Sequence, residues 1–235
     1  MLEARIVKRR RDFTVDIEMH VEAGGCLALF GPSGSGKSTI LSAIAGIEQP
    51  DAGAIRLGDL QLFPPPLPLE RRPIGYLTQE PHLFPHLTVA RNVAFGLGAP
   101  RAQRSPRESA WLDRLRGSLG LANEWNAPAS RISGGQARRV ALARMLARRP
   151  PLVMLDEPFT GLDRHLVREL IEDLLAWKSE IGFAMVVVDH QSEVLERLCP
   201  GAMVLVRGKI VQQGAWREIR ANPVDAEVRE ILRPL

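Results

Sequence analysis

The amino-acid sequence predicts an α/β fold in which short buried strands alternate with helices. Three observations support this prediction. An apolar run at 26–30 is followed by a glycine-rich loop at 31–39 and then by a helical pattern at 40–46. A second apolar run, 152–155, ends directly in two acidic residues, and a third covers 183–188. Short apolar runs of this kind are typical of strands buried in a parallel sheet.

The glycine-rich loop has the pattern G-x-x-x-x-G-K-[ST] of a phosphate-binding loop. Glycines let the backbone curl, so that its N–H groups and the positive end of the next helix point at one anion. Lys37 adds a point charge for the β- and γ-phosphates, and the Ser38 hydroxyl is placed to coordinate Mg²⁺. A glycine-rich surface turn is the alternative interpretation. The residues expected to contact the nucleotide are Gly31, Pro32, Ser33, Gly34, Ser35, Gly36, Lys37, Ser38 and Thr39.

The sequence between residues 64 and 119 predicts a loop between strands, followed by an inserted group of helices. The proline-rich stretch 64–68 is interpreted as a stiff loop between strands, with a polyproline ligand as the alternative. A linker rich in arginine, serine and proline at 99–106 leads to a helix with one apolar stripe, which is expected to pack in the core. The stripe consists of Trp111, Leu112, Leu115 and Leu119.

A second glycine-rich motif, Ser133-Gly134-Gly135-Gln136, precedes a helix predicted over 135–148. It has the features of an anion-binding helix N-terminus, but it has no lysine of its own and no strand directly before it. It therefore predicts half of a site, which two copies related by a two-fold axis would complete for each other. A turn that only caps the helix is the alternative. Four arginines near or on this helix are expected to face water or the opposite subunit: Arg138, Arg139, Arg148 and Arg149.

The second apolar run ends in Asp156 and Glu157. Ligands of open α/β sheets bind beyond the carboxyl ends of strands, so both carboxylates are expected beside the nucleotide. Asp156 is predicted to hold Mg²⁺ through its water shell, and Glu157 to face the attacking water as general base. An acidic pair at the start of a helix is the structural alternative. A further helix is predicted over 164–179, before the third apolar run.

Taken together, these motifs resemble those of the nucleotide-binding subunit of ATP-binding cassette (ABC) transporters, along nearly the whole chain. Ser133-Gly134-Gly135-Gln136 is similar to the signature motif of that family. Gln79 falls at the position of the Q-loop glutamine, Asp163 resembles the D-loop aspartate, and His190 resembles the switch histidine.

The resemblance implies a P-loop NTPase core with an N-terminal antiparallel β subdomain and an inserted α-helical subdomain. One domain is expected over 1–235, with the nucleotide-binding core at 1–85 and 151–235 and the helical signature subdomain at 86–150. ATP and Mg²⁺ are the implied cofactors. The implied metal ligands are Ser38, Gln79 and Asp156. The implied catalytic residues are Lys37, Gln79, Glu157 and His190, and the implied nucleotide contacts outside the phosphate loop are Ser133, Gly134, Gly135, Gln136 and Asp163.

The resemblance further implies an ATPase that powers solute import as a homodimer, through integral-membrane partner subunits and, indirectly, a solute-binding protein. The segment 79–97 is similar to importers of oxyanions, iron, polyamines and sugars, and the segment 71–76 leans toward molybdate-type subunits. Exposed Leu83, Phe84 and Leu87 are expected to form a groove for a short helix of the membrane subunit.

An ABC exporter ATPase is the main alternative function. A repair or translation ATPase of the superfamily would typically show a long coiled-coil insertion or two cassettes. A small-molecule kinase would show an acceptor-binding lid. Because the motifs end shortly before Leu235, regulation through a C-terminal barrel, found in many members of the importer group, is not expected.

The sequence departs from the family pattern at several positions. Ile132 replaces the usual leucine of the signature, and the D-loop reads Thr160-Gly161-Leu162-Asp163 instead of the commoner Ser-Ala-Leu-Asp, but neither change removes a reacting group. Two further departures concern the adenine base and the switch histidine. Where the family places an aromatic residue for the adenine base, the segment 8–11 is wholly basic, so adenine is expected to rest on an arginine plane or on nothing specific. Asp189 stands where a small hydroxyl residue usually precedes the switch histidine, and the sequence offers no physical reason for it.

The composition predicts a protein that meets the membrane only through partners. Hydrophobic residues make up 45% of the 235 residues, enough for a substantial core, but no apolar stretch approaches the ~18 residues of a membrane span. The N-terminus lacks the apolar core of a signal peptide. The net charge of +4 is attributed mainly to coding bias and solvated helix faces, and no nucleic-acid partner is expected. The expected location is the cytoplasmic face of the inner or plasma membrane.

Cys26 and Cys199 are the only cysteines of the sequence. Two cysteines so far apart are expected to form no disulfide framework and to suit a reducing cytoplasm.

Overall fold

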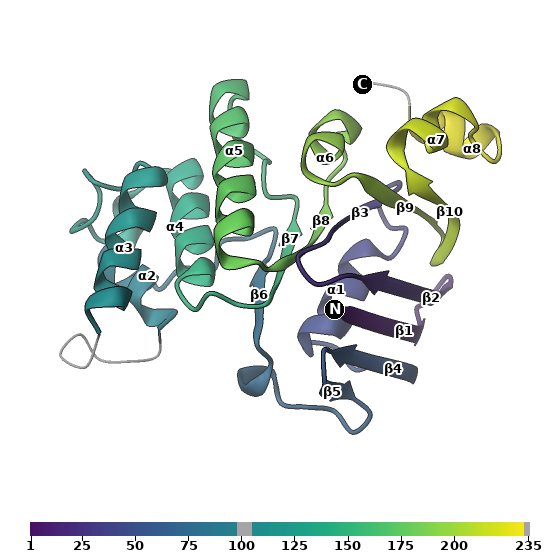
Figure 1. The fold of residues 1–235 in the computed structure, drawn as a ribbon, viewed down its shortest axis with the longest axis horizontal. Helices are drawn as coiled ribbons and strands as arrows, with labels where there is room; N and C mark the ends of the chain where they lie inside the picture. The colour runs from purple at the N-terminus through teal and green to yellow at the C-terminus, as the bar shows by residue number, and fades with distance from the viewer. Residues whose placement is uncertain (98–104, 233–235) are drawn as a thin grey trace.

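In the computed structural model, which describes residues 1–97 and 105–232, the strands form two sheets (Figure 1). The first sheet is antiparallel, in the order β2-β1-β4-β5. Its strands are β1 (Leu2–Arg9), β2 (Thr14–Val21), β4 (Ala52–Leu57) and β5 (Leu60–Phe63). The second sheet has the order β10-β9-β3-β8-β7-β6, and all of its pairs are parallel except β10 with β9. Its strands are β3 (Cys26–Phe30), β6 (Ile74–Leu77), β7 (Leu152–Asp156), β8 (Ala184–Val188), β9 (Gly201–Val206) and β10 (Lys209–Ala215).

The helices separate into groups along the molecule. Helices α2, α3 and α4 lie together at one end, and the antiparallel sheet lies at the other (Figure 1). The α-helices are α1 (Lys37–Ala45), α2 (Val89–Phe95), α3 (Pro106–Ser118), α4 (Gly134–Leu146), α5 (Arg164–Ile181), α6 (Ser192–Leu198), α7 (Trp216–Ala221) and α8 (Ala226–Ile231). Two 3₁₀ turns, η1 (Leu69–Arg71) and η3 (Ala129–Arg131), precede β6 and α4. The α/β fold expected from the sequence, with its antiparallel and parallel sheets, is confirmed.

The burial of the strands follows their sequence patterns. Every second residue of β2 is buried, as expected for a strand with one face toward the core, whereas all five residues of β7 and of β8 are buried. The predicted helix ends are close to the observed ones. Gly46 ends α1 and Gly182 ends α5, both with positive φ angles, a backbone conformation that glycine adopts without steric cost.

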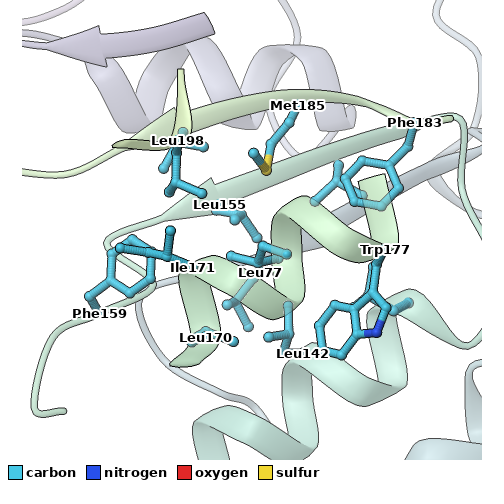
Figure 2. Packing of buried hydrophobic residues seen from close by; sticks show 14 of the residues in the cluster. Leu77, Leu142, Leu155, Phe159, Leu170, Ile171, Trp177, Phe183, Met185 and Leu198 are labelled. Atoms are coloured by element: carbon cyan, nitrogen blue, oxygen red, sulfur yellow. The ribbon is translucent and has the colours of Figure 1, made fainter. Parts of the chain in front are cut away.

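The core consists of two apolar clusters, one on each side of the parallel sheet. One cluster includes residues of α3, α4 and α5 packed on the sheet, where Trp177 lies beside Phe183, and Ile171 and Leu155 lie near the centre (Figure 2). The other cluster surrounds α1, between the parallel and antiparallel sheets. The apolar stripe of α3 is buried as predicted, and Trp111, the largest of its side chains, donates a hydrogen bond from Nε1 to the carbonyl of Leu146.

One expectation is wrong in the structure. The two cysteines are bonded to each other, because β9 pairs with β3 and brings Cys199 beside Cys26 despite the 173 residues between them. Phe13 directly precedes β2 and lies against Gly36 of the glycine loop. The predicted linker at 99–106 lies mostly outside the described residues.

A buried arginine, Arg72, caps the C-terminus of α1. The Arg72 side chain, in a residue only 5% exposed, donates from Nη1 to the carbonyls of Ala43 (3.1 Å) and Ile44 (2.6 Å) at the C-terminus of the helix. Its other nitrogens donate to the carbonyls of Leu62 and Leu67, both at 3.0 Å. A cation at this position also complements the negative end of the helix dipole.

Replacement of Arg72 by methionine is expected to lower the free energy of unfolding by about 3 kcal/mol, because several buried carbonyls lose their donor. In a chain of this size that loss corresponds to a thermal midpoint roughly 10 °C lower. Arg71→Met is the matched control, since the neighbouring Arg71 is exposed. Equal midpoints for the two variants, measured by circular dichroism, would show that the buried bonds contribute nothing.

Candidate functional site

Four parallel strands bring the sequence motifs to one edge of the six-stranded sheet. In the order β3-β8-β7-β6 neighbouring strands run in the same direction, so their carboxyl ends lie side by side. β3 leads into the glycine loop, β8 into Asp189 and His190, β7 into Glu157, and β6 toward Gln79. Residues far apart in the chain therefore meet where ligands of open α/β sheets bind.

The glycine loop curls tightly into α1. Gly36 caps the helix with φ 109°, and a Cβ added there would approach the Val15 side chain to 2.8 Å. A Cβ on Gly31 would lie 2.1 Å from the carbonyl oxygen of Leu205, so only glycine fits at that position. The loop thus presents the amides at the N-terminus of α1 without side chains in between, as an anion site requires.

Lys37 is folded onto its own loop. Its Nζ donates to the carbonyls of Gly31 and Pro32, both at 2.8 Å. Burial lowers the pKa of Lys37, while the nearby carboxylates of Glu157 and Asp156 oppose that change. The ammonium therefore lies between the loop and the acidic pair, where a phosphate group would find a fixed positive charge.

Ser38 and Asp156 form a set of hard oxygen donors. The Ser38 side chain is hydrogen-bonded to the Asp156 carboxylate, and the Tyr76 hydroxyl donates to Asp156 Oδ2 at 3.3 Å. Burial is the main cause that raises the pKa of Asp156. A hydroxyl paired with a partly desolvated carboxylate suits Mg²⁺, which takes oxygen ligands and few of them from the protein. The residues present therefore fit the implied metal.

Glu157 has an unusual backbone conformation. Its φ angle is +50°, in the left-handed region that costs a residue with a side chain free energy, and its N–H donates to the carbonyl of Val188 at 2.8 Å. This conformation turns the Glu157 carboxylate toward Gln79, whose Nε2 donates to Oε2 at 3.1 Å. Backbone strain held by the neighbouring strand is a feature that clusters at functional sites.

Asp189 and His190 follow β8 with opposite exposure. The His190 side chain is 49% exposed, and its Nδ1 lies 3.6 Å from Asp189 Oδ1, which also accepts from the N–H of Gln191. Asp189 is fully buried, and its Oδ2 has no hydrogen-bond partner among the described residues. Burial raises the pKa of Asp189.

One cavity of about 580 Å³ unites part of the predicted site. The predicted residues that line it are Gly31, Pro32, Ser33, Lys37, Glu157 and His190.

Ser133 and Asp163 do not line this cavity. Ser133 caps α4 in a capping box with Gln136, and Asp163 caps α5 by accepting from the N–H groups of His165 and Leu166. Within one chain these two side chains therefore serve as helix caps, and Ser133 is exposed.

Arg138 contacts the site, whereas Arg139 contacts the end of α3, and the sequence revealed neither contact. Arg138, expected to face water or the opposite subunit, is only 8% exposed, because its guanidinium donates to the carbonyls of Gln79 and Glu157. Arg139 is also half-buried and donates to the carbonyl of Leu119. The expectation for both residues was wrong, whereas Arg148 and Arg149 are exposed.

Arg10 lies over the start of α1. Its Nε and Nη2 donate to Thr39 Oγ1 at 3.1 and 2.8 Å, and Nη1 and Nη2 donate to the Glu48 carboxylate at 2.8 and 2.6 Å. These bonds occupy the edges of the guanidinium plane and fix its orientation. The basic run at 8–11 indicated an arginine, but only the fold identifies which one reaches the phosphate loop.

Comparisons with known proteins identify similar sequences. A family model described as ABC transporter matches residues 14–160. The Fe(3+) ions import ATP-binding protein of Pseudomonas fluorescens is 42% identical over 217 residues, which cover 90% of this chain and 60% of that protein. The molybdate/tungstate import ATP-binding protein of Pyrococcus abyssi is 36% identical, over 92% of this chain and 62% of its own length. The chain thus spans about three fifths of these relatives.

Solved structures have the same fold. The dimeric structure of the bacterial ABC transporter cassette MJ0796 has a TM-score of 0.80 and 26% identity, and covers 92% of this chain and 98% of that one. A structure of the same cassette in a post-hydrolysis state bound to ADP and Pi has a TM-score of 0.78, with the same identity and coverage. Within residues 1–97 and 105–232, no helix is both long and apolar enough to cross a membrane.

Proposed function

The chain belongs to the ABC transporter family, and from that premise we propose that it is the ATP-hydrolysing subunit of a solute importer. The observation that carries the proposal is the cavity in which Lys37, Glu157 and His190 converge while Ser133 stays exposed on α4. One chain therefore contains a phosphate cradle (the loop at 31–39 with Lys37), a general base (Glu157) and a switch residue (His190). The exposed N-terminus of α4 lies outside its own cavity and is free to meet another nucleotide.

The residues of the cradle have separate roles in hydrolysis. Lys37 and the loop amides hold the β- and γ-phosphates, and Glu157 accepts the proton of the attacking water. Mg²⁺, held by Ser38 and Asp156 with Gln79 nearby, would neutralise charge on the phosphates. His190 hydrogen-bonds the γ-phosphate and loses that partner when the phosphate leaves.

A second copy completes each site. In a two-fold dimer, Ser133 and the N–H groups at the start of α4 meet the γ-phosphate held by the partner's loop, and Asp163 lies near the same interface. ATP then joins the two subunits and hydrolysis separates them. The dimeric bacterial cassette with 26% identity supports this assembly.

The contact with membrane subunits is proposed for the surface between α2 and the segment 79–88. Leu83, Phe84 and Leu87 are half-buried there, and Phe84 packs against Phe95, which is 61% exposed, with 4.6 Å between the ring centroids. A short helix with an apolar face would cover these side chains. The subunit would accordingly work at the cytoplasmic face of the membrane, held there by its partners.

The cargo is proposed to be an inorganic ion. The relatives with the names quoted above import Fe(3+) or molybdate and tungstate, which supports import over the exporter alternative. The test is co-purification with the membrane subunits, reconstitution into liposomes, and a screen of ferric, molybdate, tungstate, phosphate and sugar solutes with a binding protein. Stimulation of ATPase activity by an inorganic ion, with its uptake, is expected. ATP-dependent efflux of a solute from the liposomes would refute the importer.

Arg10 is proposed as the platform for the adenine base. Because four of its five N–H groups are bonded to Thr39 and Glu48, the faces of the guanidinium are left for stacking, and only one N–H group, on Nη1, could read the base. Arg10→Ala is expected to raise KM for ATP by about fivefold, and ATP and GTP should have KM values within about threefold of each other. Arg10→Tyr should restore the affinity. Unchanged KM in Arg10→Ala, or a strong preference for ATP, would contradict the stacking role.

A further inference from the structure

Arg138 connects three parts of the molecule. It lies on the first turns of α4, two residues after Gln136 of the Ser133-Gly134-Gly135-Gln136 motif, and its guanidinium reaches two backbone carbonyls outside that helix. One carbonyl belongs to Gln79, near the start of the segment that follows β6, and the other to Glu157, directly after β7. A single planar side chain with several donors is needed for this bridge, because the two acceptors lie on separate strand ends.

The charge of Arg138 also has nearby partners. Burial lowers the pKa of Arg138, and the carboxylates of Glu157, Asp189 and Asp156 oppose that change by favouring the charged guanidinium. Asp156 and Asp189 are at least nine-tenths buried. The Arg138 cation therefore offsets negative charge that has little access to water.

A second arginine on the same helix strengthens the connection between α4 and the segment after β6. Arg144 donates to the carbonyls of Pro81 and His82, both at 2.9 Å, and lies over the Phe84 ring at 5.5 Å. The segment from Gln79 to Phe84 is therefore attached to α4 at two points. Only Arg138 continues the connection to Glu157.

We propose that Arg138 is a positioning residue that transmits the position of α4 to the backbone of Glu157 and Gln79. The inference rests on the proposed function. When ATP draws Ser133 onto the partner's nucleotide, α4 moves with it, and Arg138 sets the orientation of the general base in its own subunit. Hydrolysis of one nucleotide thereby depends on engagement of the other, which makes turnover cooperative between the two sites.

The test compares Arg138→Lys, Arg138→Met and the control Arg168→Gln, since Arg168 is exposed on α5. In Arg138→Met, kcat is expected to fall by about 10- to 100-fold, because Glu157 is misplaced, while KM changes by less than about twofold. The Hill coefficient should fall toward one. Arg138→Lys should recover part of kcat, because an ammonium keeps the charge but bridges the two carbonyls poorly. Arg168→Gln should match the wild type.

Hydrogen exchange in the nucleotide-free protein gives a readout that needs no activity. Faster exchange in the segment 79–84 is expected in Arg138→Met, with unchanged exchange in β8. If the wild type does not hydrolyse ATP but Arg138→Met still exchanges faster at 79–84, the proposed ATPase function is refuted, whereas the structural connection of Arg138 to Gln79 and Glu157 is supported. The inference is overturned if folded Arg138→Met keeps the wild-type kcat and Hill coefficient, or if kcat, KM and thermal midpoint all deteriorate together and Arg138→Lys recovers none of them.

Discussion

Glu157→Gln is expected to bind MgATP and to hydrolyse it about 100-fold more slowly than the wild type, or slower still, because an amide cannot accept the proton of the attacking water. The substitution keeps the size of the side chain and its contact with Gln79, where an amide oxygen can still accept the bond now 3.1 Å long. ATP is then retained, and the nucleotide-bound dimer should accumulate. Size-exclusion chromatography with ATP and Mg²⁺ detects it as a species of twice the 26.0 kDa chain mass.

Glu172→Gln is the control for this experiment, because Glu172 is an exposed carboxylate on α5. It should hydrolyse ATP at the wild-type rate and show no excess of dimer. A persistent monomer of Glu157→Gln with normal turnover would remove Glu157 from the mechanism. The thermal midpoint provides an independent check of folding. Glutamine can adopt the left-handed φ of Glu157 as readily as glutamate, so the midpoint of the variant should be close to that of the wild type.

Lys37→Ala should abolish measurable turnover, because Lys37 is the only charged side chain of the phosphate loop. Loss of one preorganised charge at a reacting phosphate typically lowers kcat by about 100- to 1,000-fold. ATP binding should also weaken, in contrast with Glu157→Gln. Steady-state kinetics and a fluorescent ATP analogue measure the two effects separately.

The fold of Lys37→Ala is expected to persist. Among the described residues, the ammonium of Lys37 donates only to groups of its own loop, namely the carbonyls of Gly31 and Pro32 and the Ser35 hydroxyl. Burial already lowers the pKa of Lys37, so the substitution removes a partly desolvated charge. Lys209→Ala, which alters an exposed lysine of β10, is the matched control. An unchanged ATPase rate in Lys37→Ala would refute the assigned role.

The motifs could be predicted from the sequence because their chemistry is local. In the loop at 31–39 the spacing of glycines, lysine and hydroxyl is itself the geometry of an anion site, since neighbouring residues of one curled backbone hold all of its parts. The buried strands β7 and β8 were equally visible, as uninterrupted apolar runs. The role of Ser133 as half of a shared site stays a prediction, since one chain contains only the capped helix.

The partners of those motifs could not be predicted, because they depend on which strands become neighbours. The bridge of Arg138 to Gln79 and Glu157 requires β6 beside β7 with α4 packed on β6, and the cysteine bond requires β9 beside β3. The strained φ of Glu157 is likewise held by a bond to β8.

By itself, the sequence determined which residues can cradle a phosphate, because that depends on spacing along a few consecutive positions. Only the tertiary structure decided which carboxylates, carbonyls and cations meet around them. The physical reason is that sheet order and helix packing are set by burial over the whole chain, and no short pattern carries that information.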